Sequence, residues 1–400
     1  MTNKVIWKLA IISIVILIRL MAPSFIIAAD EPYIFGLLLV GSHNDHSESH
    51  EFFEAGKYAE KMIPGTKMIY IEKVNPTDRP DITIPMLVHD MVEKGAKLII
   101  ASSIDMKDSI LESALSHPEI NFIQIFGDEV LTGKAPKNLS NLVVRMEYGK
   151  MMAGFAAALT TKTGKIGYLG PLANQETRLM AVSCYLGAKY AWENVLKKDP
   201  KELKFQVTWI GFWFNIPGVT AEPAVVAQNL FNTGYDVVVS GISTNEALVA
   251  AKQKREKDKN VWAIPYLSVD ACESAPEVCL CVPYFNWGPG YIQFLKAAMT
   301  GKWQSKWLSL EPDWKDINNP DTSPAGFVAG SALTASAKEE LDGFIKALGS
   351  KKIDLFKGPL YYQDGSPFIK AGQTATDKML WVMNQLLMGM TESSNAKKTD

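Results

Sequence analysis

The sequence predicts an α/β protein made of two lobes, each a doubly wound parallel sheet with helices on both faces. Apolar runs of strand length alternate with stretches of helical spacing over residues 33–127, and the same alternation restarts at residues 165–265. The chain has 400 residues, of which 47% are hydrophobic, and this length favours two domains over one. No sequence repeat relates the two halves, so they share a pattern only.

The first lobe begins with a nearly continuous apolar run at residues 35–40, which is typical of a buried parallel strand. A helix with one apolar face is expected directly after it, and Gly95 and Pro118 mark the ends of the next two helices. The expected strands are 35–40, 67–72, 97–101, 122–126 and 142–144, and the expected helices are 51–62, 84–94 and 109–117.

The second lobe repeats this order after a helix of small residues at 147–160. Its expected strands are 165–169, 204–210, 235–240 and 261–265, and its expected helices are 177–196, 223–233 and 245–256. After residue 280 the pattern is less regular, with helices expected at 291–299 and 337–348. The polar tail at 391–400 is predicted to be disordered.

The first 29 residues are interpreted as a secretory signal peptide. Lys4 and Lys8 precede an apolar run at 9–18, and small residues follow before Asp30. An uncleaved membrane anchor is the alternative, although Arg19 interrupts the apolar stretch. We therefore expect an exported protein, periplasmic or at the extracellular face of the cytoplasmic membrane.

Three of the four cysteines cluster within ten residues. Outside the cytosol, a Cys272–Cys279 disulfide that closes a short loop is the natural interpretation. Zinc is the alternative, but the cluster has no C-x-x-C pair and no nearby histidine.

Charge and motifs exclude several classes of function. The formal net charge is −2, without the basic stripe that nucleic-acid binding needs. We find no phosphate-binding loop, no dinucleotide fingerprint and no nucleophile motif, so neither an enzyme nor a cofactor is expected. His43, His46 and His50 lie close together among acidic residues; a solvated loop is our interpretation, with a metal site as the alternative.

Candidate binding residues follow the expected strands of both lobes, at the sheet edge where open α/β folds bind ligands. They combine amides, hydroxyls and carboxylates with aromatic rings, a mixture that suits a flat polar ring. They are Asn44, Asp45, Ser103, Asp105, Trp213, Thr244 and Tyr266.

The chain resembles the basic membrane protein family of substrate-binding proteins of ABC importers, in its nucleoside-binding branch. The resemblance covers residues 33–389 and rests on VGSHND, ASSIDMKD, RMEYGKMMAGFAAALTTKTGKIGYLG, WIGFWFNIP and VPYFNWGPGYI. It implies a type I periplasmic-binding-protein fold whose lobes are joined by three crossings. It also implies lobes at residues 30–150 with about 283–310 and at 151–282 with about 311–390, a nucleoside ligand, a membrane permease as partner, and a monomer.

By the same resemblance, the polar candidates of the first lobe match the family's ligand contacts. Trp213 matches its stacking platform, Thr244 a ligand loop, and Asn286 a crossing that touches the ligand. The sequence departs from the family pattern at Ser47, Glu48 and Leu267. These departures predict altered recognition, so a free base, a sugar or a metal remains an alternative ligand, and a signalling receptor of the same fold remains an alternative function.

Overall fold

The computed structural model describes residues 31–44, 48–242, 244–257, 260–266 and 268–394. The expected signal peptide at residues 1–29 lies outside the described residues, and so do Asp45, His46 and Leu267. Within the described ranges, no helix combines the length and the hydrophobicity needed to cross a membrane.

The order of elements follows the strand and helix alternation expected from the sequence. The strands are β1 (Tyr33–Leu38), β2 (Thr66–Ile71), β3 (Ala96–Ala101), β4 (Asn121–Ile125), β5 (Leu139–Val144), β6 (Lys165–Gly170), β7 (Lys204–Trp209), β8 (Val237–Ser240), β9 (Trp262–Ile264), β10 (Cys281–Phe285), β11 (Trp307–Leu310), β12 (Ala325–Ala329), β13 (Leu360–Tyr361), β14 (Pro367–Ile369) and β15 (Met390–Ser394). The α-helices are α2 (Glu48–Met62), α3 (Ile84–Glu93), α4 (Lys107–Ser116), α5 (Glu147–Thr160), α6 (Gln175–Tyr190), α7 (Pro223–Asn232), α8 (Glu246–Arg255), α9 (Gly288–Met299), α10 (Ala335–Gly349) and α11 (Asp377–Leu380).

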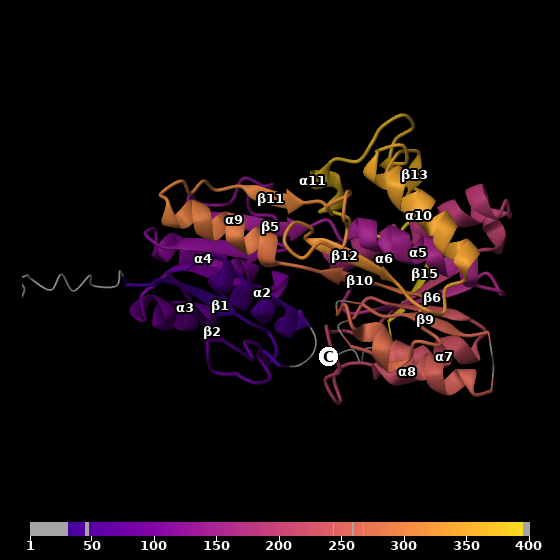
Figure 1. The fold of residues 1–400 in the computed structure, drawn as a ribbon, viewed down its shortest axis with the longest axis horizontal. Coiled ribbons are helices and arrows are strands. Elements are labelled where there is room, and N and C mark those ends of the chain that lie inside the picture. The colour runs from indigo at the N-terminus through magenta and orange to yellow at the C-terminus, as the bar shows by residue number, and fades with distance from the viewer. Residues whose placement is uncertain (1–30, 45–47, 243, 258–259, 267, 395–400) are drawn as a thin grey trace, which may run out of the picture. The chain divides into compact units, whose positions relative to one another are not determined.

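Two parallel sheets form the centres of the two lobes. The first has the strand order β11-β5-β4-β3-β1-β2, and the second has the order β15-β7-β6-β8-β9. Helices α2 and α9 pack together, as do α3 and α4 in the first lobe and α5 with α6 and α7 with α8 in the second (Figure 1). The prediction of two doubly wound lobes is confirmed.

The chain passes between the two sheets three times, as the resemblance implied. It leaves the first sheet after β5, returns through β10 into α9, and crosses again between β11 and β12. Strands β10 and β12 pair antiparallel, from Cys281 opposite Ala329 to Phe285 opposite Ala325 (Figure 1). The second and third crossings therefore lie side by side as a two-stranded ribbon.

Two edge strands differ from the sequence predictions. Residues 307–310 lie in the less regular part of the chain after residue 280, where we expected no strand, yet they form β11 and pair with β5. The prediction of a disordered tail is wrong for residues 391–394, because β15 pairs with β7 along its whole length. Neither segment has the sequence pattern of a strand. Each becomes a strand because its backbone pairs with the free N–H and C=O groups of the neighbouring strand.

Helices α5 and α6 approach each other until their backbones touch at two glycines. A Cβ on Gly154 would lie 1.8 Å from the carbonyl oxygen of Cys184, and a Cβ on Gly187 would lie 1.9 Å from that of Met151. Neither contact leaves room for a side chain. The two glycines therefore set the distance between these helices, which is smaller than ordinary side-chain packing allows.

We expect Gly154→Ala to destabilise the protein by about 1 to 3 kcal/mol, because the added methyl group forces apart two packed helix backbones. Urea unfolding followed by circular dichroism measures the change. Gly343→Ala in α10 is the matched control, because no atom lies within 4 Å of its Cβ position, and it should stabilise by roughly 0.5 to 1 kcal/mol. Equal effects of the two changes would contradict the close helix packing.

Candidate ligand-binding site

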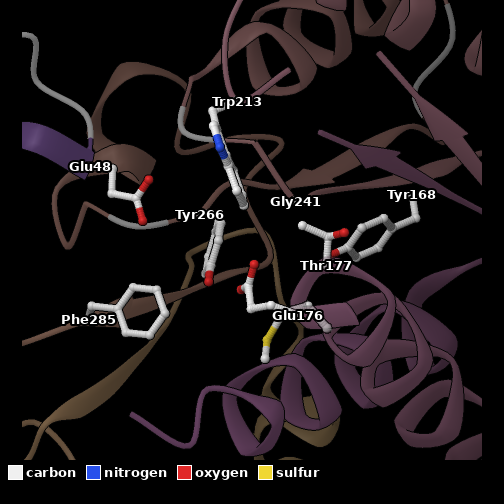
Figure 2. A pocket seen from close by; sticks show the side chains of 9 residues that line it. Glu48, Tyr168, Glu176, Thr177, Trp213, Gly241, Tyr266 and Phe285 are labelled. Carbon is white, nitrogen blue, oxygen red and sulfur yellow. The ribbon is translucent and has the colours of Figure 1, made fainter. Parts of the chain in front are cut away.

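A small cavity lies where the carboxyl ends of the two sheets meet. It is lined by Glu48, Tyr168, Glu176, Thr177, Met180, Trp213, Gly241, Tyr266 and Phe285 (Figure 2). Glu48 starts α2 after β1, Glu176 starts α6 after β6, and Gly241 follows β8. In each sheet the strand order reverses at these positions, where open α/β sheets bind their ligands.

The cavity has a volume of only about 10 Å³, which is about the least that a single water molecule requires. Its walls are the rings of Trp213 and Tyr266, both seen edge-on in Figure 2, with the carboxyl groups of Glu48 and Glu176 directed towards the space beside them. A larger ligand therefore needs the two lobes, or the Trp213 side chain, to move outward.

Trp213 bridges the two lobes. It lies in the loop after β7, and its indole Nε1 donates a hydrogen bond of 2.7 Å to Oδ2 of Asp105, which lies in the loop after β3. Asp105 and Ser103 are themselves connected, since the Ser103 hydroxyl lies 3.3 Å from both the backbone nitrogen and Oδ2 of Asp105. This contact holds the cleft together on one side of the cavity.

A second and larger cavity adjoins this bridge. It has a volume of about 510 Å³ and is lined mainly by the loop at residues 74–84, with Asp105 from the first lobe and Phe212 from the second. It lacks the buried carboxyl and the paired rings of the small cavity. The small cavity is therefore the candidate ligand-binding site.

A buried lysine supports the ring of Tyr266. The side chain of Lys150 in α5 is fully buried, its Nζ donates to the carbonyl oxygen of Ser240 at 2.8 Å, and it lies 3.2 Å from the centroid of the Tyr266 ring. A desolvated cation on an aromatic face contributes about 2 kcal/mol or more. Burial nevertheless lowers the pKa of Lys150 to about 7, against the raising influence of Cys184, Glu176 and Cys281.

Glu176 is the buried acid of the cavity. It is 4% exposed, and burial raises the pKa of Glu176 to about 7, opposed by the positive charge of Lys150 and assisted by the negative charge of Asp105. The helix start is fixed by a capping box between Asn174 and Thr177, a position whose dipole favours an anion by less than about 2 kcal/mol. Desolvation outweighs that dipole, so Glu176 exchanges its proton near neutral pH.

The chain is similar to known proteins over most of its length. The model of the Bmp family, described as ABC transporter substrate-binding protein PnrA-like, matches residues 34–310. The chain belongs to this family. Substrate-binding proteins of ABC transporters bind small solutes and work with a permease, and they are not enzymes, which confirms the sequence prediction.

Two characterised relatives illustrate the range of the family. The purine-binding protein of Brucella abortus (strain 2308) is 26% identical over 366 residues, which cover 91% of this chain and 94% of that protein. The nucleoside-binding protein BmpA of Lactococcus lactis subsp. cremoris (strain MG1363) is 28% identical over 178 residues, which cover 43% of this chain and 46% of that protein.

Solved structures show the same fold at low sequence identity. A solute-binding protein of an ABC transporter from Aeropyrum pernix K1 has a TM-score of 0.63 at 13% identity, covering 81% of this chain and 93% of that one. A second, from Conexibacter woesei DSM 14684, has a TM-score of 0.59 at 16% identity, covering 80% and 98%. The fold is the type I periplasmic-binding-protein fold, as expected.

The structure brings some of the candidate residues to the cavity and leaves others apart. Trp213 and Tyr266 line it, and Asp105 bonds to Trp213. Asn44 lies in an exposed turn after β1. Thr244 bonds through its hydroxyl to the carboxylate of Glu246 in the next helix.

Asn286 makes hydrogen bonds within the protein at the second crossing. Its amide nitrogen donates to the carbonyl oxygens of Pro320 and Ser323, both at 2.8 Å. It thereby joins the start of α9 to the loop before β12. The structure shows this tether, and the ligand contact implied by the resemblance stays a prediction.

Sequence reasoning missed Lys150 and Glu176. Lys150 could have been singled out from the sequence. Apart from Glu147 at the first position, it is the one charged residue of α5, whose sequence EYGKMMAGFAAALT is otherwise mostly apolar. Glu176 gave no such signal, because an acid in the first turn of a helix is ordinary.

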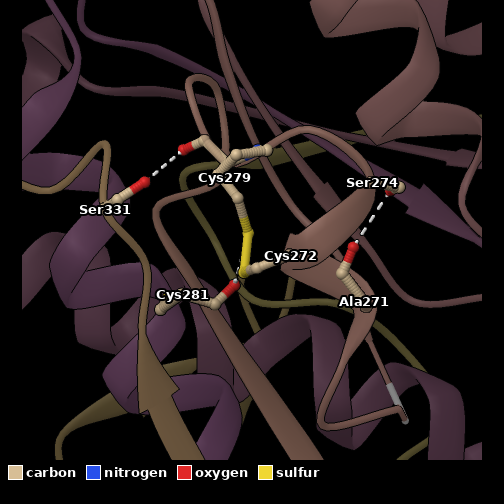
Figure 3. Close-up of a disulfide and its surroundings, with 7 residues drawn as sticks. Ala271, Cys272, Ser274, Cys279, Cys281 and Ser331 are labelled. Carbon is tan, nitrogen blue, oxygen red and sulfur yellow. Dashed lines mark hydrogen bonds between the residues drawn. A yellow bond between two sulfur atoms is a disulfide. The ribbon is translucent and has the colours of Figure 1, made fainter.

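The expected disulfide site closes the loop that leads into the second crossing. Cys272 and Cys279 are bonded in the structure (Figure 3). Cys279 also forms a β-bridge with Ala263 of β9, and its carbonyl oxygen accepts a hydrogen bond from the backbone nitrogen of Ala332. The loop between Tyr266 and β10 is thus attached to both neighbouring segments.

The histidine-rich segment makes protein contacts. Nδ1 of His43 lies 2.6 Å from Oε2 of Glu72, and Nδ1 of His50 lies 3.0 Å from the carbonyl oxygen of His43. Among the residues that the structure describes, no group of three or more His, Cys, Asp or Glu side chains could hold a metal ion. His46 lies outside the described residues.

The lowered pKa of Lys150 predicts a pH-dependent stability. Between pH 7 and its ordinary pKa of 10.5, the unfolded chain holds a proton that the native protein has released, so wild-type stability rises with pH. Lys150→Met removes this dependence. We expect the stability of the variant relative to wild type to fall by up to about 1.4 kcal/mol per pH unit from pH 8 to 10.

Urea unfolding of both proteins at half-unit steps of pH measures this difference. Lys346→Met, which removes an exposed lysine of α10, controls for the loss of a lysine amine at the surface. A stability difference between Lys150→Met and wild type that stays constant from pH 8 to 10 would contradict a neutral Lys150 in the native protein.

Proposed function

We propose that the protein captures a purine nucleoside or a closely related purine in the cavity between its lobes and delivers it to the permease of an ABC importer. The supporting observation is the cavity, in which the rings of Trp213 and Tyr266 lie beside the buried carboxyl of Glu176. Aromatic faces stack on flat rings, while a few buried polar groups fix the orientation of a ligand by its edges.

The names of two relatives support the ligand class. One is a purine-binding protein that aligns with 91% of this chain, and the other is a nucleoside-binding protein that aligns with 43% of it. We infer the same ligand class here, because aromatic and hydrogen-bonding side chains line the cavity between the lobes of this chain. The ligand contacts proposed in the first lobe are Asn44, Asp45, Ser103 and Asp105, and those in the second are Trp213, Tyr266 and Thr244, with Asn286 at the crossing.

Binding then proceeds by hinge motion, without any bond being made or broken. The lobes separate at the three crossings, the hydrogen bond between Trp213 and Asp105 opens, and the ligand enters. Reclosure places groups from both lobes on the ligand, so only the loaded protein is held in the closed state. The permease recognises that closed state. We propose an exported monomer that works at the outer side of the cytoplasmic membrane, directed there by residues 1–29.

A thermal-shift screen tests the ligand class. Purine and pyrimidine nucleosides, free bases, sugars and Zn²⁺ are each added to the purified protein. A ligand at 100 times its dissociation constant adds about 2.7 kcal/mol to the free energy of unfolding. We expect this rise with purines. A rise with sugars or Zn²⁺ alone, or with none of the compounds, would reject the proposed ligand class while the fold assignment stands.

Trp213 provides a second test at the level of one side chain. Trp213→Ala should weaken purine binding by roughly 1 to 3 kcal/mol, because it removes a stacking surface for the base. Trp213→Phe keeps an aromatic face but loses the indole donor to Asp105, and should lose less. Isothermal titration calorimetry measures both variants, and unchanged affinity in Trp213→Ala would rule out the stacking role.

A further inference from the structure

The Glu176 carboxyl is a polar group that the protein itself leaves incomplete. Its Oε2 atom is buried and has no hydrogen-bond partner among the described residues. The side chain comes from the first turn of α6 and reaches into the cavity next to Tyr266 (Figure 2). A buried carboxyl oxygen without a partner lowers the stability of the folded protein, so natural proteins rarely keep one without a use.

The charged groups that act on Glu176 do not supply the missing hydrogen bond to its carboxyl. Lys150 is the cation whose charge acts on Glu176, but its Nζ donates to the carbonyl oxygen of Ser240 and lies against the Tyr266 ring. No ion pair between Lys150 and Glu176 occurs within the described part of the chain. The carboxyl therefore keeps hydrogen-bonding capacity on the side that faces the cavity.

The chemistry of a carboxyl group defines what can use this capacity. An uncharged carboxylic acid offers one donor and one acceptor, and a carboxylate offers two acceptors. Adenine presents an N6 donor beside a ring-nitrogen acceptor, so it matches the acid. Guanine presents the two adjacent donors N1–H and N2–H, so it matches the carboxylate.

Resting on the proposed function, we propose that Glu176 reads the hydrogen-bonding edge of a purine base and that its protonation state sets the preference between adenine and guanine. The uncharged form selects adenine compounds, and the charged form selects guanine compounds. Stacking on Trp213 and Tyr266 is common to both, so discrimination depends on this one carboxyl.

The environment allows Glu176 to change its charge in the neutral range. The charged groups that act on Glu176 are Lys150 from α5 and Asp105 from the short 3-10 helix after β3. The other titratable groups around the cavity are Tyr168 from β6, Tyr266 after β9 and Glu48 from α2. Burial, the largest cause, raises the pKa of Glu176 to about 7. The acid form therefore dominates at pH 6 and the carboxylate at pH 8.

The experiment is to measure dissociation constants of adenosine and guanosine by calorimetry with the full chain at half-unit steps from pH 5.5 to 8.5. We expect the ratio of the adenosine constant to the guanosine constant to increase by roughly tenfold or more over this range, the size of one mismatched buried hydrogen bond. This measurement needs no variant. A ratio that does not change with pH would overturn the inference.

Glu176→Gln identifies the group responsible. The amide permanently offers one donor and one acceptor, like the uncharged acid, so the variant should bind adenosine with near wild-type affinity at pH 6 and at pH 8. It should bind guanosine roughly tenfold or more weakly than wild type at pH 8. A wild-type pH profile in this variant would overturn the inference, because another group would then be responsible.

Glu129→Gln is the matched control. Glu129 is also a buried carboxyl, 3% exposed, with its pKa raised by burial, but it bonds to Asn141 in the first lobe and does not line the cavity. It should leave both affinities and the pH profile unchanged. If wild type binds neither nucleoside at any pH, the proposed function itself fails; if it binds both without discrimination, only the role of Glu176 fails.

Discussion

The contact between the backbones of α5 and α6 is the constraint on which the rest of the second lobe depends. Gly154 and Gly187 let these helices touch, and each helix carries a buried side chain with a strongly shifted pKa near the cavity. Lys150 lies one turn before Gly154 in α5, and Glu176 lies in the first turn of α6. A larger spacing between the helices would change the distance of both groups from Tyr266.

Lys150 and Glu176 are buried at a cost in folding free energy. Apolar side chains in their place would make the protein more stable. The lowered pKa of Lys150 and the raised pKa of Glu176 have the same physical origin, which is burial away from water. Protein cores retain such groups where binding needs them, because a ligand that completes their hydrogen bonds gains more than one that meets a solvated surface. The second lobe thus keeps two buried polar groups next to the cavity at a cost in stability.

Most of the fold could be predicted from the sequence because its elements are encoded locally. The apolar runs and the helix ends at Gly95 and Pro118 place strands and helices within a few residues of their observed bounds. Strands β11 and β15 could not be predicted this way, since their order comes from β5 and β7, which are distant in the sequence.

The lining of the cavity was predictable only in part. Trp213 and Tyr266 line it and were among the candidates because they follow strands beside amides, hydroxyls and carboxylates, whereas Glu176 resembles any acid at a helix start. Whether a polar side chain faces a cavity or closes a local turn, as Thr244 does with Glu246, depends on backbone directions that spacing does not contain.

Strand β15 is the outermost strand of the second sheet on the side of β7. It covers the outer edge of β7 and is attached through side chains as well, with Trp209 Nε1 donating to the carboxylate of Glu392 at 2.6 Å and the Thr391 hydroxyl lying 2.6 Å from the Gln206 amide oxygen. An uncovered β7 would offer a row of free backbone groups to another molecule. β15 thereby becomes the edge of this sheet, and its short polar sequence, MTESS, with the charged Glu392, is a poor template for the addition of a further strand.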